Sequence, residues 1–128
     1  MRLLLDTHTL IWFLTDSPKL PPKVRTQLLA PDAELFFSSV SVLEVALKHS
    51  LKPEQMPCSA DELKSDSEAS ALRELPFVGR HALKVGELPW LHRDPFDRML
   101  IAQAMCEDMM LVSHDVQVLS YGGNMIGF

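Results

Sequence analysis

The sequence predicts one α/β domain with a central, mostly parallel sheet of four to five strands. The first observation is that short apolar runs alternate with longer helical patterns along the whole chain. The second is that turn-forming residues separate most of these segments. The third is size, because 128 residues that are 47% hydrophobic suffice for one core. No repeat or interdomain linker divides the chain, so we expect a single domain over residues 1–128.

Two strands and four helices are expected in the first half of the chain. They are a strand at 2–6, helices at 10–14 and 21–30, a strand at 34–40, and helices at 42–49 and 59–72. The first apolar run ends at Asp6, and Pro31 ends the second helix. Ser59 and Glu62 have the spacing of a capping box, which predicts the start of the fourth helix.

The second half predicts three more strands with helices between them. They are a strand at 74–78, a helix at 80–87, a helix that begins at 95 and extends at least to 105, a strand at 109–113, a short helix or turn at 116–121 and a strand at 125–128. Pro76 weakens the first of these strands. The longest helix has a clear start, because Asp94 is a good N-cap and Pro95 falls at the first helical position.

Two carboxylates three residues apart lie at the start of that longest helix. Asp94 and Asp97 share one helix face, so both side chains point toward whatever lies beyond the helix N-terminus. The helix that follows is largely apolar, so we expect it to be buried. From the sequence alone these two acids are either helix caps or metal ligands.

Four acids are expected to meet at one edge of the sheet. In a parallel sheet, ligands bind at the carboxyl ends of the strands, near the point where the strand order reverses. The acids that the chain order brings to this edge are Asp6, Glu44, Asp97 and Asp115. Each has an ordinary explanation as well: Asp6 as a helix cap, Glu44 in a capping box with Ser41, Asp97 as a partner of the helix dipole, and Asp115 as a turn residue.

The four acids together favour a metal site over four separate structural roles. Like charges that close repel one another, and no evident Lys or Arg is available for each. Oxygen-only ligands indicate a hard cation, Mg²⁺ or Mn²⁺, and such ions suit phosphoryl chemistry. Secondary roles are open for nearby polar residues. Thr7 or Thr9 is a candidate for orienting a ligand or water, and Arg98 either contacts phosphate or pairs with Asp94.

Charge and composition exclude several other classes of protein. The net charge is −5 and no basic run occurs, which argues against a passive nucleic-acid binder but not against a metal-dependent enzyme. Two cysteines are too few for a disulfide framework, and no stretch is long and apolar enough for a membrane span. We therefore expect a cytoplasmic protein. Trp12 and Trp90 are more typical of core residues than of base-stacking platforms.

Four segments of the chain resemble the PIN-domain family, and within it the VapC-type toxins of type II toxin–antitoxin systems. The segments are Leu-Leu-Leu-Asp6-Thr-His-Thr, Ser-Val-Leu-Glu44-Val-Ala, His-Arg-Asp-Pro-Phe-Asp97-Arg-Met-Leu-Ile-Ala-Gln-Ala and Leu-Val-Ser-His-Asp115. They occur in the family's order over essentially the whole chain. The segment at 92–104 is the most specific, and Ser113 stands where Thr is frequent.

The resemblance implies a three-layer α/β/α sandwich and a Mg²⁺- or Mn²⁺-dependent endoribonuclease. It assigns Asp6, Glu44, Asp97 and Asp115 to the catalytic metal site, and Asp94 matches an additional acid of one subgroup. It also implies an RNA substrate, a homodimer and a small cognate antitoxin, for which Leu20, Val24, Leu28 and Trp12 are candidate surface positions. The alternative is a PIN-like binding module without significant nuclease activity.

Overall fold

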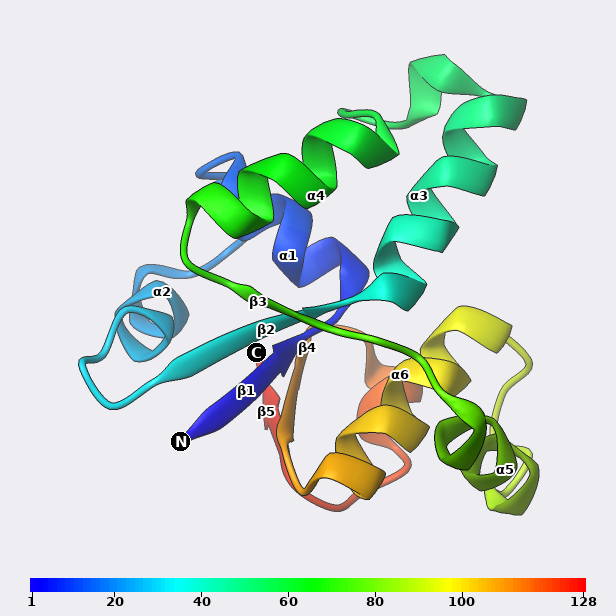
Figure 1. Ribbon diagram of the computed structural model, residues 1–128. Helices are drawn as coiled ribbons and strands as arrows, with labels where there is room; N and C mark the ends of the chain where they lie inside the picture. The colour runs from blue at the N-terminus through cyan, green and yellow to red at the C-terminus, as the bar shows by residue number, and fades with distance from the viewer.

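The computed structural model describes residues 1–128 (Figure 1). The elements in chain order are β1 (Arg2–Leu5), α1 (Thr7–Leu14), α2 (Pro22–Leu28), β2 (Glu34–Ser38), α3 (Ser39–Leu51), the 3₁₀ turn η1 (Pro53–Gln55), α4 (Ala60–Ala69), β3 (Arg73–Leu75), α5 (Gly79–Glu87), α6 (Pro95–Glu107), β4 (Met110–Ser113), α7 (Val116–Leu119) and β5 (Met125–Gly127). The expected strands and helices are therefore all present.

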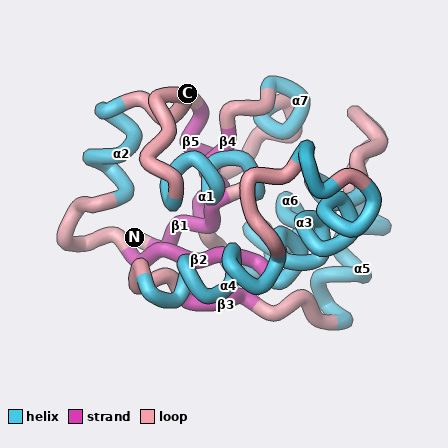
Figure 2. The backbone as a smooth tube through the Cα atoms, turned by 90° about the horizontal axis from the view of Figure 1, so that it is seen from above, coloured by secondary structure: helices cyan, strands magenta, loops and turns pink.

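All five strands are parallel and lie in the order β3-β2-β1-β4-β5 (Figure 2). The chain first adds β2 and β3 on one side of β1, then returns to add β4 and β5 on the other side. β4 pairs directly with β1, with Leu5 opposite Val112. The strand order therefore reverses between β1 and β4, and the carboxyl ends of these two strands mark the expected ligand position.

Alternating side chains of the strands point to opposite faces of the sheet and pack into two separate cores, one on each face. Leu3 and Leu5 pack under α1, α2 and α4, whereas Leu4 packs against α6 on the opposite face. In β4, Leu111 and Val112 divide in the same way. In Figure 1, α1, α2 and α4 lie above the sheet and α5 and α6 lie below it. This confirms the three-layer α/β/α sandwich.

Two helices begin earlier than the sequence predicted, and the caps explain both. The Asp6 side chain accepts a hydrogen bond from the Thr9 amide, so α1 begins at Thr7 rather than at residue 10. Ser38 caps α3 in the same way through the Val40 amide. The capping box considered as an alternative explanation for Ser41 and Glu44 is therefore absent, because both residues lie inside α3.

The exposed apolar residues are not those that the sequence suggested. Leu20, Val24 and Leu28 are 3%, 5% and 2% exposed and belong to the core, so they offer no partner surface. Trp90, expected in the core, is 76% exposed. The exposed apolar residues include a stripe on α3 with i, i+4, i+8 spacing, made by Leu43, Leu47 and Leu51. None of the helices has the length and apolar character that a membrane crossing requires.

Candidate functional site

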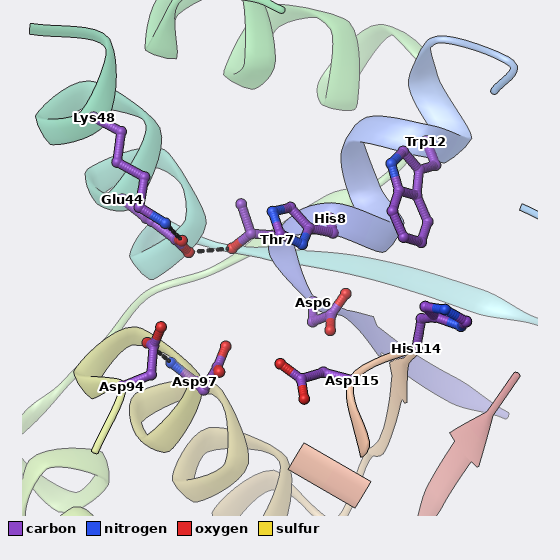
Figure 3. Close-up of a pocket in the computed structure, with 10 residues that line it drawn as sticks. All are labelled: Asp6, Thr7, His8, Trp12, Glu44, Lys48, Asp94, Asp97, His114 and Asp115. Carbon is purple, nitrogen blue, oxygen red and sulfur yellow. Dashed lines mark hydrogen bonds and ion pairs between the residues drawn. The ribbon is translucent and has the colours of Figure 1, made fainter. Parts of the chain in front are cut away.

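A polar cavity of about 240 Å³ opens at the carboxyl edge of the sheet (Figure 3). It is lined by Asp6, Thr7, His8, Trp12, Glu44, Lys48, Asp94, Asp97, His114 and Asp115. All four acids expected to meet at this edge are therefore present, and the fifth, Asp94, joins them. In Figure 3 the carboxylates of Asp6, Asp97 and Asp115 point into the same space.

Asp6 and Asp115 come from the two strands at which the strand order reverses. Each follows the last residue of its strand closely and caps the next helix, so a carboxylate oxygen of Asp6 accepts from the Thr9 amide at 2.9 Å and one of Asp115 accepts from the Gln117 amide at 2.8 Å. The structural explanation considered for Asp6 is thus correct, and it does not compete with a functional one. Capping fixes each carboxyl group in place while it lines the cavity.

Glu44 reaches the cavity from the second turn of α3 and is held by two polar neighbours, Thr7 and Lys48. The Thr7 hydroxyl donates to Glu44 Oε1 at 2.7 Å and also contacts the Ser41 hydroxyl at 2.9 Å. Lys48, one helical turn further on, pairs with Glu44 Oε2. Thr7 therefore orients Glu44, and Lys48 is a basic partner that the i, i+4 spacing could have revealed.

Asp94 and Asp97 reach the cavity from the start of α6, as their spacing predicted. Asp94 Oδ1 accepts from the Asp97 amide at 2.9 Å and caps the helix. Asp97 Oδ2 lies 3.1 Å from His92 Nε2, and the other ring nitrogen of His92 lies 2.8 Å from the Tyr121 hydroxyl. His92 and Tyr121 were not among the site residues predicted from the sequence.

Burial raises the pKa of two of these acids, and for Asp97 the neighbouring carboxylates add to the effect. The pKa of Asp97 rises to about 6, first because burial disfavours the carboxylate and then because of the charges on Asp94, Asp115 and Asp6; the hydrogen bond from His92 opposes the rise. Burial also raises the pKa of Asp6, and hydrogen bonds from Ser113 and Thr9 counteract it. The cavity therefore places negative charge where it is unfavourable without a cation.

The donor set of the cavity fits a hard divalent cation. Five carboxylates and a single lysine line it, and carboxylate oxygens are the ligands that Mg²⁺ and Mn²⁺ favour. As the side chains stand, no three His, Cys, Asp or Glu groups are close enough to hold one ion.

Arg98 does not line the cavity, and neither role considered for it is correct. The residue is 2% exposed. Its guanidinium group donates to the carbonyl groups of Val85, Leu88 and Pro89 and to the Tyr121 hydroxyl, and it lies 3.9 Å from the centre of the Trp90 ring. With its donors used inside the protein, Arg98 neither pairs with Asp94 nor reaches a phosphate in the cavity.

The fold and this acidic cavity define a three-layer α/β protein that presents clustered carboxylates at the point where its strand order reverses. The chain belongs to the PIN-domain family, whose model matches residues 3–123. No curated protein matches the chain significantly. The family expected from the sequence motifs is therefore confirmed.

Three solved structures of toxin–antitoxin complexes have a similar fold. VapBC2 from Rickettsia felis, bound to a DNA fragment from its promoter, has a TM-score of 0.69 at 19% identity, with 100% of this chain and 98% of that chain covered. DNA-bound VapBC from Salmonella typhimurium has a TM-score of 0.69 at 16% identity, with 100% and 97% covered. VapBC-1 from nontypeable Haemophilus influenzae has a TM-score of 0.67 at 17% identity, with 100% and 97% covered.

Proposed function

We propose that this PIN-domain protein is a Mg²⁺- or Mn²⁺-dependent RNA endonuclease, the toxin of a type II toxin–antitoxin pair. The observation that carries the proposal is the convergence of Asp6, Glu44, Asp94, Asp97 and Asp115 on one cavity, where the pKa of Asp97 is raised to about 6. A fold that only needed caps would gain nothing from concentrating five acids there. The cost in charge repulsion is explained when the site binds a cation.

Asp6, Asp97 and Asp115 would hold the cation, and Glu44 would assist as a further ligand or as a general base. A bound divalent cation polarises a phosphate group and lowers the pKa of a coordinated water. The protein contributes preorganisation: helix capping fixes Asp6 and Asp115, and the Thr7 hydroxyl holds Glu44. Asp94 fixes the start of α6 and adds negative charge beside Asp97.

The aromatic rings at the cavity suit single-stranded RNA. Trp12 lines the cavity, stacks on His8 with 5.8 Å between ring centres, and meets His114 edge-on. Lys19 lies 5.9 Å from the Trp12 ring and, with Lys48, adds positive charge near a site lined by five carboxylates. Trp12 is half-buried and packs against the core, as expected, and it also lines the cavity. Unpaired bases stack on accessible aromatic rings, so we propose that Trp12 also contacts a base of the substrate.

Removing the Trp12 ring should weaken RNA binding without unfolding the protein. Because one base–aromatic stack contributes roughly 1–3 kcal/mol, Trp12→Leu should raise the Kd for single-stranded RNA by about tenfold or more. Fluorescence anisotropy with a labelled oligonucleotide measures this in an Asp115→Asn background, where the strand is expected to stay intact. Trp90→Leu is the matched control, and an equal loss in both variants would contradict a specific contact at Trp12.

A cognate antitoxin and a second copy of the chain are the proposed protein partners. The structural neighbours are toxin–antitoxin complexes, which supports the first. The stripe of Leu43, Leu47 and Leu51, exposed by 47%, 46% and 81%, is an apolar surface available for either partner. We propose that the protein acts in the cytoplasm, where its RNA substrate is found and where Cys58 and Cys106, both unpaired, stay reduced.

The decisive test compares cleavage by the wild-type protein with cleavage by Asp115→Asn. Protein freed of metal by chelation should leave single-stranded RNA intact, and added Mg²⁺ or Mn²⁺ should restore cleavage in the wild type only. Loss of a charged ligand is expected to lower the rate at least 100-fold, a loss of several kcal/mol in transition-state stabilisation.

The matched control for this test is Asp66→Asn, an exposed position on α4 outside the cavity. It should cleave as the wild type does. Cleavage by Asp115→Asn at the wild-type rate would overturn the nuclease assignment. Tight binding of an antitoxin without any cleavage would instead favour the binding module.

A further inference from the structure

A hydrogen-bond network links Asp97 to the interior of the protein. His92 Nε2 lies 3.1 Å from Asp97 Oδ2, and His92 Nδ1 lies 2.8 Å from the Tyr121 hydroxyl. The same hydroxyl accepts from Arg98 Nη1 at 3.0 Å and from the His92 amide at 3.3 Å. Tyr121 follows α7 and Arg98 lies within α6, so the network ties together segments that are distant in the sequence.

The network determines which nitrogen of His92 carries the proton. A tyrosine hydroxyl has two acceptor lone pairs and one proton to donate. Arg98 and the His92 amide fill both acceptor positions. The hydroxyl must therefore donate, and His92 Nδ1 at 2.8 Å is a better acceptor than the His92 carbonyl at 3.5 Å. With Nδ1 accepting, the proton lies on Nε2 and points at Asp97 Oδ2.

Arg98 holds the hydroxyl in place. Its guanidinium group also donates to the carbonyl groups of Val85, Leu88 and Pro89, which lie at the end of α5 and in the loop before α6. The His92 side chain is 5% exposed, so water has little access to its ring. The orientation of the ring is therefore set by buried polar contacts.

We propose that His92, fixed as its Nε2–H form by Tyr121, is a positioning residue for Asp97. Its N–H bond occupies one oxygen of the carboxylate and directs the other, Oδ1, to which the structure gives no hydrogen bond, toward the cavity. The proposal rests on the proposed function, since it takes Asp97 as a ligand of the proposed cation. Groups that hydrogen-bond to metal ligands in this way typically contribute 10- to 100-fold in metal affinity.

The tautomer can be tested without any metal. In ¹⁵N-histidine-labelled, metal-free protein at pH 8, the NMR shifts of His92 should be those of an Nε2–H imidazole. Tyr121→Phe removes the donor to Nδ1, so the Nδ1–H form should become populated. A wild-type ring protonated on Nδ1, or an unchanged tautomer in Tyr121→Phe, would overturn the assignment of Tyr121.

Calorimetric titration with Mn²⁺ tests the positioning role separately. His92→Ala should raise the Kd for Mn²⁺ by about tenfold. His92→Gln, which places an amide N–H near the position of Nε2, should recover part of the loss. His49→Ala, outside the cavity, is the control and should bind as the wild type does. Thermal unfolding of each variant checks that the fold is retained.

The outcomes separate the two proposals. Wild-type Mn²⁺ binding with equal affinity in His92→Ala would overturn the positioning role and leave the metal site standing. Equal losses in His92→Ala and His92→Gln would also contradict it, because the donor would then not matter. Absence of Mn²⁺ binding by the wild type would overturn the metal site itself, and the positioning role of His92 with it.

Discussion

Asp97→Asn should abolish divalent-cation binding and at the same time stabilise the cation-free protein. The pKa of Asp97 is raised to about 6 by burial and by the charges on Asp94, Asp115 and Asp6, so at pH 7 the folded state carries an unfavourable carboxylate. Asparagine removes the charge and keeps an oxygen for the His92 N–H. One pKa unit is worth about 1.4 kcal/mol, and because the side chain is partly exposed we expect a gain of about 1–2 kcal/mol in the free energy of unfolding.

The pH dependence of stability gives this prediction its sign. Between pH values near 3.8 and 6, folded protein holds a proton on Asp97 that the unfolded chain has released. The contribution of this group to stability therefore falls as the pH rises through that window. Urea unfolding of chelator-treated protein measures the free energy of unfolding at each pH. As the pH rises through this window, that free energy should fall less in Asp97→Asn than in the wild type.

Two observations would contradict this prediction. One is a variant that is less stable than the wild type at pH 7, which would mean that the Asp97 charge has a favourable partner in the cation-free state. The other is calorimetry in which Asp97→Asn binds Mn²⁺ with wild-type affinity. The exposed substitution Asp66→Asn is the control, with a change in stability below about 0.5 kcal/mol.

Arg98→Met should destabilise the fold by about 3–5 kcal/mol, the largest stability effect that we expect from one substitution. The guanidinium group donates to three backbone carbonyls and to Tyr121, and methionine leaves those acceptors without their donor. Lysine recovers little, because one ammonium group cannot reproduce the planar, branched arrangement of donors. Denaturant midpoints of the three proteins measure the effect.

Arg93→Ala is the control for Arg98, because Arg93 is exposed and lies in the loop just before α6. Its effect on stability should be within about 0.5 kcal/mol. Suppose that Arg98→Met unfolds at the wild-type denaturant concentration but binds RNA more weakly. That result would contradict the structural role and support the phosphate contact considered from the sequence. The structure favours a role inside the protein, where Arg98 holds the loop before α6 and the Tyr121 hydroxyl, since Arg98 does not line the cavity.

The acids of the site could be predicted from the sequence because topology alone brings them together. Asp6 and Asp115 each follow a strand, and parallel strands end at one edge. Asp94 and Asp97 are fixed by helix periodicity. These inferences need only the order of the elements, and a boundary error of a few residues, such as the late start expected for α1, does not disturb them.

The neighbours of the acids could not be predicted in the same way. The contact between His92 and Tyr121 joins residues 29 positions apart, and nothing in the local pattern of either indicates the other. Arg98 follows Asp97 directly, so the sequence suggested a role in the site. In a helix, adjacent residues point in directions about 100° apart, and Arg98 consequently faces the loop after α5 rather than the cavity. Side-chain packing between distant segments decides such roles.

The pairing of β1 with β4 couples the chemistry of this protein to the completion of its folding. Asp6 and Asp115 become neighbours only when Leu5 lies opposite Val112, a contact between opposite ends of the sequence. Contacts of such long range form at a high cost in loop-closure entropy and limit the folding rate of parallel sheets. A partly folded chain therefore contains all the carboxylates, but they are not yet brought together in one site. For the nuclease that we propose, incompletely folded molecules should therefore lack activity.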